Sequence, residues 1–382
     1  MNFNLVFDRF QNQIPLANLS AGNEIDEQNW CQWPYTVMPR FVTYCQQHHF
    51  SVTLHSIDSY PKNSWYPIAF GHYKFDIDYF QLLSDTVKSA VINKDLRLLF
   101  YYHEGDNPKR IEQDLSSKCL ANQLPMTWKF VSANTTAGIC FDDHELFYRY
   151  ANRRYSALQY HDKHRSRQFT ALNRLHKWWR ATIMTDLIDQ NLLDQSYWSY
   201  NGVGSDDIED TPIQIDQIKG LRTKVLQFVG NAPYRCDELE DHQHNQHSLL
   251  VAKYFEDSYI HFVFETFFDV DQSGGTFLTE KTFKPIKHAQ PFLIFGPPGT
   301  LQRLRALGYR TFDHEIDSSY DAIIDNTQRW FQLRKIVKDL SQQDLRAICR
   351  RCRADVIHNQ KTFLSDKFSR LETLYNKLHE TS

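Results

Sequence analysis

The sequence feature that most constrains the fold is residues 258–308, where a strand, a loop, a helix, a second strand and a second helix are expected in succession. Residues 259–264 form a short apolar run of aromatic and β-branched side chains, which is typical of a buried strand. A polar loop over 269–275 follows, then a helix with Thr279 as its N-cap, and then a second apolar strand over 292–295. This order predicts a parallel α/β sheet, whose ligands bind beyond the carboxyl ends of the strands.

A second unit of the same kind is expected nearer the N-terminus. Residues 76–93 predict a helix, residues 96–102 a buried strand, residues 109–122 a helix and residues 127–132 another strand. We therefore expect an α/β protein of two domains, with amphipathic helices at the C-terminal end, the last of them a long helix over 343–378. The expected boundaries are residues 1–160, 161–340 and 341–382.

The composition and charge of the chain indicate which kinds of binding partner and which compartment to expect. The 382-residue chain has a formal net charge of −3, so no overall field attracts it to nucleic acid or to a membrane. We expect no transmembrane segment, because no apolar stretch approaches the roughly 20 residues that a span requires. The N-terminal residues do not resemble a signal peptide. Seven scattered cysteines suggest reduced thiols in the cytoplasm.

The first candidate phosphate site follows an expected strand over 169–173. Residues 174–190 are expected to form a helix, so Asn173 and Arg174 would lie at its start and Arg180 within it. The first turn of a helix offers unpaired N–H groups, and an arginine can hold a phosphate through two parallel hydrogen bonds. The alternative is that these arginines are ordinary surface residues of a helix.

The second candidate phosphate site is the start of the helix after Thr279. Lys281 supplies a charge for a diphosphate, and Lys284 lies three residues further on the same helix face. Glu280 could accept hydrogen bonds from both hydroxyls of a ribose. Glu265, at the end of the preceding strand, is expected near the same edge. The alternative is a charged first turn facing solvent.

A candidate general base lies after the expected strand over 96–102. His103, Glu104 and Asp106 form a polar turn, and an imidazole or carboxylate there could deprotonate an acceptor hydroxyl. A turn stabilised by its own polar side chains explains the pattern equally well.

Metal binding is not expected, although two motifs could support it. Asp269 and Asp271 form a DxD pair that could hold Mg²⁺ or Mn²⁺ under a nucleotide diphosphate. Cys349 and Cys352 form a CxxC pair, but it lies in a helical pattern without a second pair of cysteines.

Several of these segments together resemble the donor domain of the α1,3-fucosyltransferases. The resemblance rests on Phe264-Glu265, on FLTEKTFKP at 277–285 and on PFLIFG at 291–296. FTALN at 169–173, followed by Arg180, is similar to that family's strand, asparagine and phosphate-binding arginine. The resemblance covers roughly residues 165–335, and it extends to uncharacterised glycosyltransferase-like proteins of bacteriophages and bacteria.

The resemblance implies a GT-B architecture, in which two Rossmann-like domains face a cleft and the C-terminal one binds a nucleotide sugar. By matching positions, Arg180 and Lys281 would hold the diphosphate and Glu280 the ribose. The implied reaction transfers a sugar to a hydroxyl of a glycan or a modified nucleobase, with inversion and without a metal cofactor. Thr266 follows Glu265 where the family has asparagine, so the sugar is left open.

Two other functions remain open from the sequence. One is a metal-dependent glycosyltransferase that uses Asp269 and Asp271. The other is a nucleotide- or glycan-binding module without catalysis. A DNA acceptor is a further option, because a local basic patch over 163–180 could contact a nucleic-acid backbone.

Overall fold

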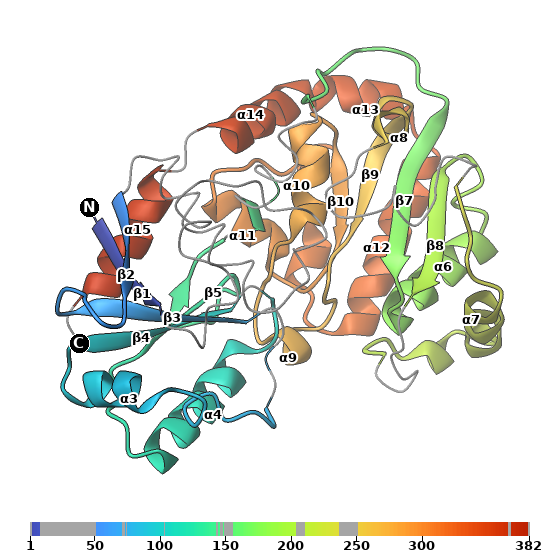
Figure 1. Cartoon of the computed structure of the whole chain (residues 1–382). Helices are drawn as coiled ribbons and strands as arrows, with labels where there is room; N and C mark the ends of the chain where they lie inside the picture. Colours follow the sequence, from blue (N-terminus) through green and yellow to red (C-terminus); the bar gives the residue numbers. More distant parts are fainter. Residues whose placement is uncertain are drawn as a thin grey trace. The chain divides into compact units, whose positions relative to one another are not determined.

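The protein is described by a computed structural model. The residues that it describes are 2–7, 51–70, 73, 75–102, 104–142, 144–145, 148, 156–203, 211–236, 251–365 and 368–380. The chain divides into two compact units (Figure 1). Unit 1 comprises Met1–Phe147, Asp271–Gly275 and Asp366–Ser382, and unit 2 comprises Tyr148–Val270 and Thr276–Ser365. The boundaries expected at residues 160 and 340 stay predictions.

Unit 1 contains a parallel sheet with the strand order β2-β1-β3-β4-β5-β6. The strands are β1 (Asn2–Phe7), β2 (Ser51–Ser56), β3 (Ser64–Phe70), β4 (Leu96–Tyr102), β5 (Lys129–Ser132) and β6 (Ile139–Cys140). The expected strand over 96–102 is confirmed, and its side chains are mostly buried, as its apolar sequence requires.

Helices cover both faces of this sheet. On one face lie α3 (Asp85–Ile92) and α4 (Pro108–Ala121), together with aromatic contacts such as Phe80 against Phe100 at 5.4 Å between ring centroids. On the other face lies α15 (Phe368–His379), where Tyr375 meets Phe3 at 5.1 Å. The last helix of the chain therefore packs on its first strand.

Unit 2 contains a second parallel sheet, with the strand order β10-β9-β7-β8. The strands are β7 (Arg167–Leu175), β8 (Tyr197–Val203), β9 (Ser258–Phe264) and β10 (Phe292–Phe295). The expected strands over 259–264 and 292–295 are confirmed, and all the side chains of β9 and β10 are buried. Parallel sheets in both units confirm the α/β class.

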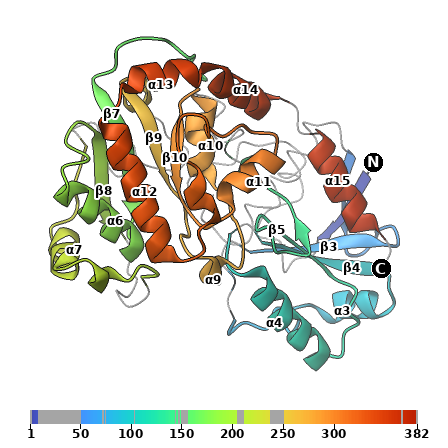
Figure 2. The ribbon, with the colours of Figure 1, turned by 180° about the vertical axis from the view of Figure 1, so that it is seen from behind.

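Helices also enclose the sheet of unit 2 (Figure 2). The helices and 3-10 turns are α6 (Trp178–Asp189), η3 (Ile215–Gln217), α7 (Leu221–Gly230), α8 (Ala252–Glu256), α10 (Glu280–Lys287), α11 (Thr300–Ala306), η4 (Ser319–Ala322), α12 (Asn326–Ser341), α13 (Leu345–Arg351) and α14 (Arg353–Leu364). One face packs on α6, α7 and α12, through Trp179 against Phe264 and Trp330 against Phe295. The opposite face carries α8 and α10, where Phe255 stacks on His261. A short helix, α9 (Val270–Ser273), lies in the expected loop over 269–275.

The structure corrects two of the expected helices. Arg174 lies in β7, and α6 begins only at Trp178, so the expectation that Arg174 opens a helix is wrong. The long helix expected over 343–378 is three helices, α13, α14 and α15. The chain turns at Cys352 between α13 and α14, and it becomes extended at Ser365, with a ψ of 164°.

None of the helices in the described residues is long and apolar enough to cross a bilayer.

Candidate functional site

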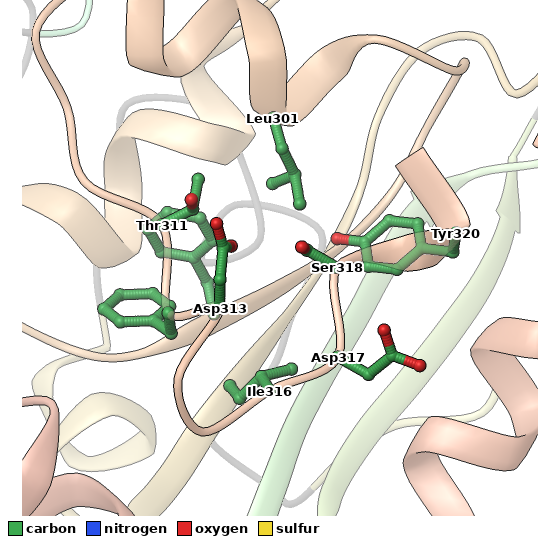
Figure 3. Close-up of a pocket in the computed structure, with 9 residues that line it drawn as sticks. Leu301, Thr311, Asp313, Ile316, Asp317, Ser318 and Tyr320 are labelled. Carbon is green, nitrogen blue, oxygen red and sulfur yellow. The ribbon is translucent and has the colours of Figure 1, made fainter. Parts of the chain in front are cut away.

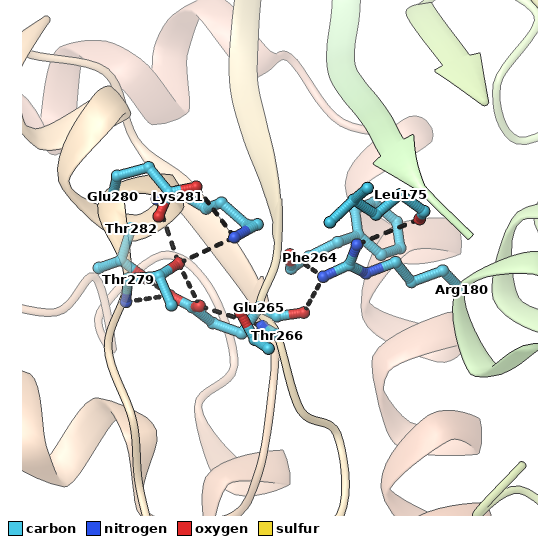
Figure 4. Close-up of polar contacts among 9 residues, drawn as sticks. All are labelled: Leu175, Arg180, Phe264, Glu265, Thr266, Thr279, Glu280, Lys281 and Thr282. Atoms are coloured by element: carbon cyan, nitrogen blue, oxygen red, sulfur yellow. Dashed lines mark hydrogen bonds and ion pairs between the residues drawn. The ribbon is translucent and has the colours of Figure 1, made fainter. Parts of the chain in front are cut away.

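One buried carboxylate organises the connection between β9 and α10. Glu265 directly follows β9, and its Oε1 accepts hydrogen bonds from the backbone nitrogen of Thr279 at 3.2 Å and the hydroxyl of Thr282 at 2.5 Å. Its Oε2 accepts the hydroxyl of Thr279 at 2.6 Å (Figure 4). Thr279 accepts from the backbone nitrogen of Lys281, which confirms Thr279 as the N-cap of α10. Glu265 therefore joins the end of β9 to the first turn of α10, and its carboxylate is engaged within the protein.

The guanidinium of Arg180 contacts the same connection from α6. Arg180 is buried and donates hydrogen bonds to the carbonyl oxygens of Leu175, Phe264 and Glu265. Figure 4 shows this guanidinium and the amino group of Lys281 on opposite sides of the end of β9. Arg180 thus fixes the carboxyl ends of β7 and β9, and the structure does not bring it together with Lys281.

A second buried arginine fixes the next part of the connection, and sequence reasoning did not single it out. Arg329 of α12 is fully buried and donates to the carbonyl oxygens of Phe268, Ile323 and Ile324. Burial lowers the pKa of Arg329 to about 10, so its guanidinium stays charged at neutral pH. No sequence motif marks an arginine in a helix whose partners are backbone carbonyl groups outside that helix.

Charged side chains gather where α10 begins, and we call Arg174, Glu280, Lys281 and Lys284 the cationic cluster. The amino group of Lys281 lies 3.0 Å from Oε1 of Glu280. Burial, together with the positive charges of Lys281 and Arg174, lowers the pKa of Lys284 to about 8, although Glu280 acts in the opposite direction. Three cations and one carboxylate therefore influence one another at this point, and the cluster carries a positive charge.

The strand register explains how Arg174 reaches this cluster. In the pairing of β7 with β9, Thr170 lies beside His261. Side chains alternate between the two faces of a sheet, so the residues four positions further along the chain from each of them lie on the same face as this pair. Arg174 therefore lies on the same face as Glu265, which is the face that α10 covers. The sequence placed Arg174 in a helix, yet the structure brings it to Lys284 from a strand end.

Two buried asparagines at this sheet edge have side-chain amide atoms without a hydrogen-bond partner among the described residues. Asn173 in β7 is 2% exposed, and neither atom of its amide has a partner among the described residues. Asn201 in β8 is 7% exposed, and its Nδ2 likewise has none. Buried polar groups are rarely left unpaired in folded proteins, so such groups at a strand end favour a ligand or ordered water nearby. Sequence analysis named Asn173 but missed Asn201, which no motif marks.

The candidate bases lie in unit 1, after β4. Glu104 is partly buried, and Asp106 is exposed and accepts a hydrogen bond from the hydroxyl of Tyr102. Burial, with the nearby charge of Asp106, raises the pKa of Tyr102 far above its usual range, so Tyr102 is the donor in this pair. His103 lies outside the described residues. Of the carboxylates of Glu104 and Asp106, the one of Asp106 therefore already accepts a hydrogen bond from a residue of unit 1.

The DxD pair is divided between the two units. Asp269 belongs to unit 2, and Asp271 lies in α9, which begins the Asp271–Gly275 segment of unit 1. This segment is fixed within unit 1 by Asn134, whose Nδ2 donates to the carbonyl of Ser273 at 2.6 Å. A Cβ at Gly275 would approach Oδ1 of Asn134 to 2.6 Å, so a larger residue here would require neighbouring side chains to shift. Among the described residues, no group of three or more His, Cys, Asp and Glu side chains is arranged to hold a metal ion.

A small pocket in unit 2 lies away from the predicted residues (Figure 3). It opens beside β10, and none of the predicted site residues lines it. Its lining residues are Phe292, Leu301, Thr311, Phe312, Asp313, Ile316, Asp317, Ser318 and Tyr320. Its two carboxylates have partners: Asp313 pairs with Arg305, and Asp317 accepts hydrogen bonds from Ser319 and Gln332.

Comparison with known proteins adds no family assignment: no protein-family model, curated protein or solved structure matches the chain. The interpretation of the site therefore rests on its own residues and on the sequence motifs.

Proposed function

We propose that the protein is a glycosyltransferase that moves a sugar from a nucleotide-diphosphate donor to a hydroxyl acceptor. The observation that supports this most directly is the cationic cluster at the carboxyl edge of a parallel sheet, where Lys281 pairs with Glu280 and the charges of Arg174, Glu280 and Lys281 all act on Lys284. This edge is where parallel α/β sheets bind ligands, and cations there favour a phosphate-bearing one. The donor-domain resemblance of the same segment supports a nucleotide sugar.

The proposed roles of the charged residues follow from the negative charge that develops during the reaction. As the bond between the sugar and the diphosphate breaks, negative charge grows on the departing diphosphate. Arg174, Lys281 and Lys284 would stabilise that charge, and such preorganised electrostatics supplies a large part of enzymatic rate enhancement. In this proposal Arg174 holds the diphosphate in place of Arg180, which the resemblance implied, because the guanidinium of Arg180 is bound to backbone carbonyls. Glu280 is the proposed partner of the ribose hydroxyls.

The remaining parts of the proposal follow the resemblance. The two units would be Rossmann-like domains facing a cleft, and Glu104, Asp106 or His103 would deprotonate the acceptor, a glycan or a modified nucleobase. The reaction would invert the anomeric centre without a metal cofactor, in the cytoplasm. Among the described cysteines, Cys119, Cys349 and Cys352 are free thiols, which fits a reducing compartment.

The first experiment is a thermal-shift panel of nucleotides and nucleotide sugars on the full chain. A ligand at 100 times its dissociation constant stabilises the protein by about 2.7 kcal/mol, which a melting curve resolves. The donor found in this way is then supplied with candidate acceptors, and release of nucleoside diphosphate is measured. Binding without release would make the protein a binding module, and activity lost in EDTA would favour a metal-dependent reaction.

The matched variants are Lys281→Ala and Lys219→Ala. Lys281 belongs to the cationic cluster, whereas Lys219 is exposed before α7. We expect Lys281→Ala to lower turnover about 10²-fold or more, on the scale of removing one donor to a developing anion. Lys219→Ala should leave turnover unchanged. Near-normal turnover in Lys281→Ala would show that this residue has been wrongly assigned.

A further inference from the structure

Asn201 is a buried polar residue whose amide nitrogen is unpaired among the described residues. It lies in β8 at the edge of the sheet of unit 2, with 7% of its surface exposed. No hydrogen-bond partner for its Nδ2 is found in the described part of the chain. Leaving such a group unpaired costs about 1–3 kcal/mol of stability. We therefore expect this amide, at the carboxyl end of a strand, to donate a hydrogen bond to a bound ligand.

The strand register places Asn201 beside Arg174. β7 and β8 pair with Asn173 opposite Tyr200 and with Leu175 opposite Val203, so Arg174 lies opposite Asn201 and the residue that follows it. Tyr200 packs on Phe228 of α7, on the face away from α10. Because side chains alternate along a strand, Asn201 projects to the other face, which it shares with Arg174 and α10.

The backbone next to Asn201 departs from regular strand geometry. The extra residue of β8 in this register is a bulge, and Gly202 has a φ of +66°, in the left-handed region that glycine adopts without strain. A Cβ at Gly202 would come within 2.8 Å of the Cβ of Ala232, so the segment that follows α7 packs closely against β8 here. The amide of Asn201 is therefore carried on a fixed element next to the cationic cluster.

We propose that Asn201 donates a hydrogen bond to one phosphate group of a bound diphosphate, while Lys281 and Lys284 contact the other and Arg174 lies between them. Neighbouring strands are about 4.8 Å apart, so Arg174 and Asn201 offer donors in a row across β7 and β8. An amide N–H suits a phosphate oxygen and adds no charge. The inference rests on the anion site of the proposed function, and it does not depend on transfer of a sugar.

The test uses inorganic pyrophosphate as the probe, titrated calorimetrically into the full-length chain. Asn201→Leu keeps the size of the side chain and removes its donors, and Asn201→Asp replaces the donor with a negative charge. We expect the affinity for pyrophosphate to fall about tenfold in Asn201→Leu and further in Asn201→Asp, because a hydrogen bond to a charged group is lost. Asn93→Asp, an exposed position in unit 1, is the charge-matched control and should bind as the wild type does.

A second readout separates ligand binding from a structural role. Removing an unpaired buried amide by an apolar group of the same shape is nearly neutral or stabilising, so ligand-free Asn201→Leu should melt no lower than the wild type. Wild-type affinity in Asn201→Leu would overturn the proposal, as would a wild-type protein that does not bind pyrophosphate. If Asn201→Leu does not fold, unchanged affinity in Asn201→Asp overturns it instead. A protein that binds pyrophosphate through Asn201 but releases no nucleotide from a sugar donor would refute only the glycosyltransferase function.

Discussion

At the scale of single residues, Glu265 is the side chain on which the site's geometry most depends. Replacing it with alanine leaves the backbone nitrogen of Thr279 and the hydroxyls of Thr279 and Thr282 without their acceptor in a buried place. We expect Glu265→Ala to lower the free energy of unfolding by about 3 kcal/mol or more. Urea denaturation measures this loss, and Glu256→Ala, at the exposed end of α8, is the control and should change little. Equal stability of the two variants would contradict the capping role.

Lys284 gives the anion site a dependence on pH. Its pKa, lowered to about 8 mainly by burial, means that the amino group loses its positive charge as the pH rises from 7 to 9. The second pKa of a phosphate group is about 6, so the charge of the ligand is nearly constant over this range. We therefore expect the affinity for nucleoside diphosphates to fall about tenfold between pH 7 and pH 9 in the wild type. Lys284→Arg keeps its charge and should show a flat profile, and an equal fall in both proteins would exclude Lys284 as the cause.

What the sequence could predict at this scale depends on whether a residue's partners are local. Thr279 caps the helix that it precedes, so its role follows from adjacent residues and is confirmed. Arg180 binds carbonyls that lie 84 and 85 residues away in sequence, and no local pattern reports those partners. The unpaired amide of Asn201 becomes visible only when burial and every potential partner are known together.

At the scale of elements, α11 shows how a helix start can depend on a distant residue. Gly299 precedes the helix with a φ of 81° and offers no side-chain cap. Asp321 supplies the cap instead, because its carboxylate accepts from the backbone nitrogens of Leu301 and Gln302 at 2.9 and 3.0 Å. We expect Asp321→Ala to lower the melting temperature through a loss of about 1–2 kcal/mol. Asp339→Ala, exposed in α12, should leave the melting temperature unchanged, and a similar effect of both would argue against the cap.

Buried strands were the elements that the sequence predicted best. β4, β9 and β10 consist mostly of apolar and aromatic residues, and such runs have few alternatives to a buried parallel strand. Helix boundaries were less predictable because polar side chains compete for backbone amides. Residues 76–93 were expected to form one helix, yet Asp78 accepts from the backbone nitrogens of Phe80 and Gln81, and Ser84 caps α3, which begins at Asp85. Periodicity alone does not show which of these side chains ends the turn.

At the scale of the whole molecule, both ends of the chain belong to unit 1, a topology that the sequence did not indicate. The expected domain boundaries placed the helices after residue 340 in a separate C-terminal part of the chain. The structure instead assigns α13 and α14 to unit 2 and α15 to unit 1. The reason lies in contacts that are distant in sequence: Tyr375 and His379 pack on Phe3, and His379 also meets the ring of Trp65. A helix with apolar residues on one face is recognisable from its sequence, but the sheet that it covers is not.

Deleting residues 366–382 should therefore destabilise unit 1 selectively. The deletion removes α15, exposes the rings of Phe3 and Trp65, and leaves the buried carboxylate of Glu145 without the ion pair that it makes with Arg370. An unpaired buried charge and exposed aromatic rings together cost several kcal/mol. Hydrogen exchange followed by mass spectrometry should show faster exchange in β1 and β3, while β9 and β10 in unit 2 keep the protection of the full chain. Equal loss of protection in the strands of both units would mean that they unfold as one, and unchanged protection of β1 would mean that α15 contributes little to unit 1.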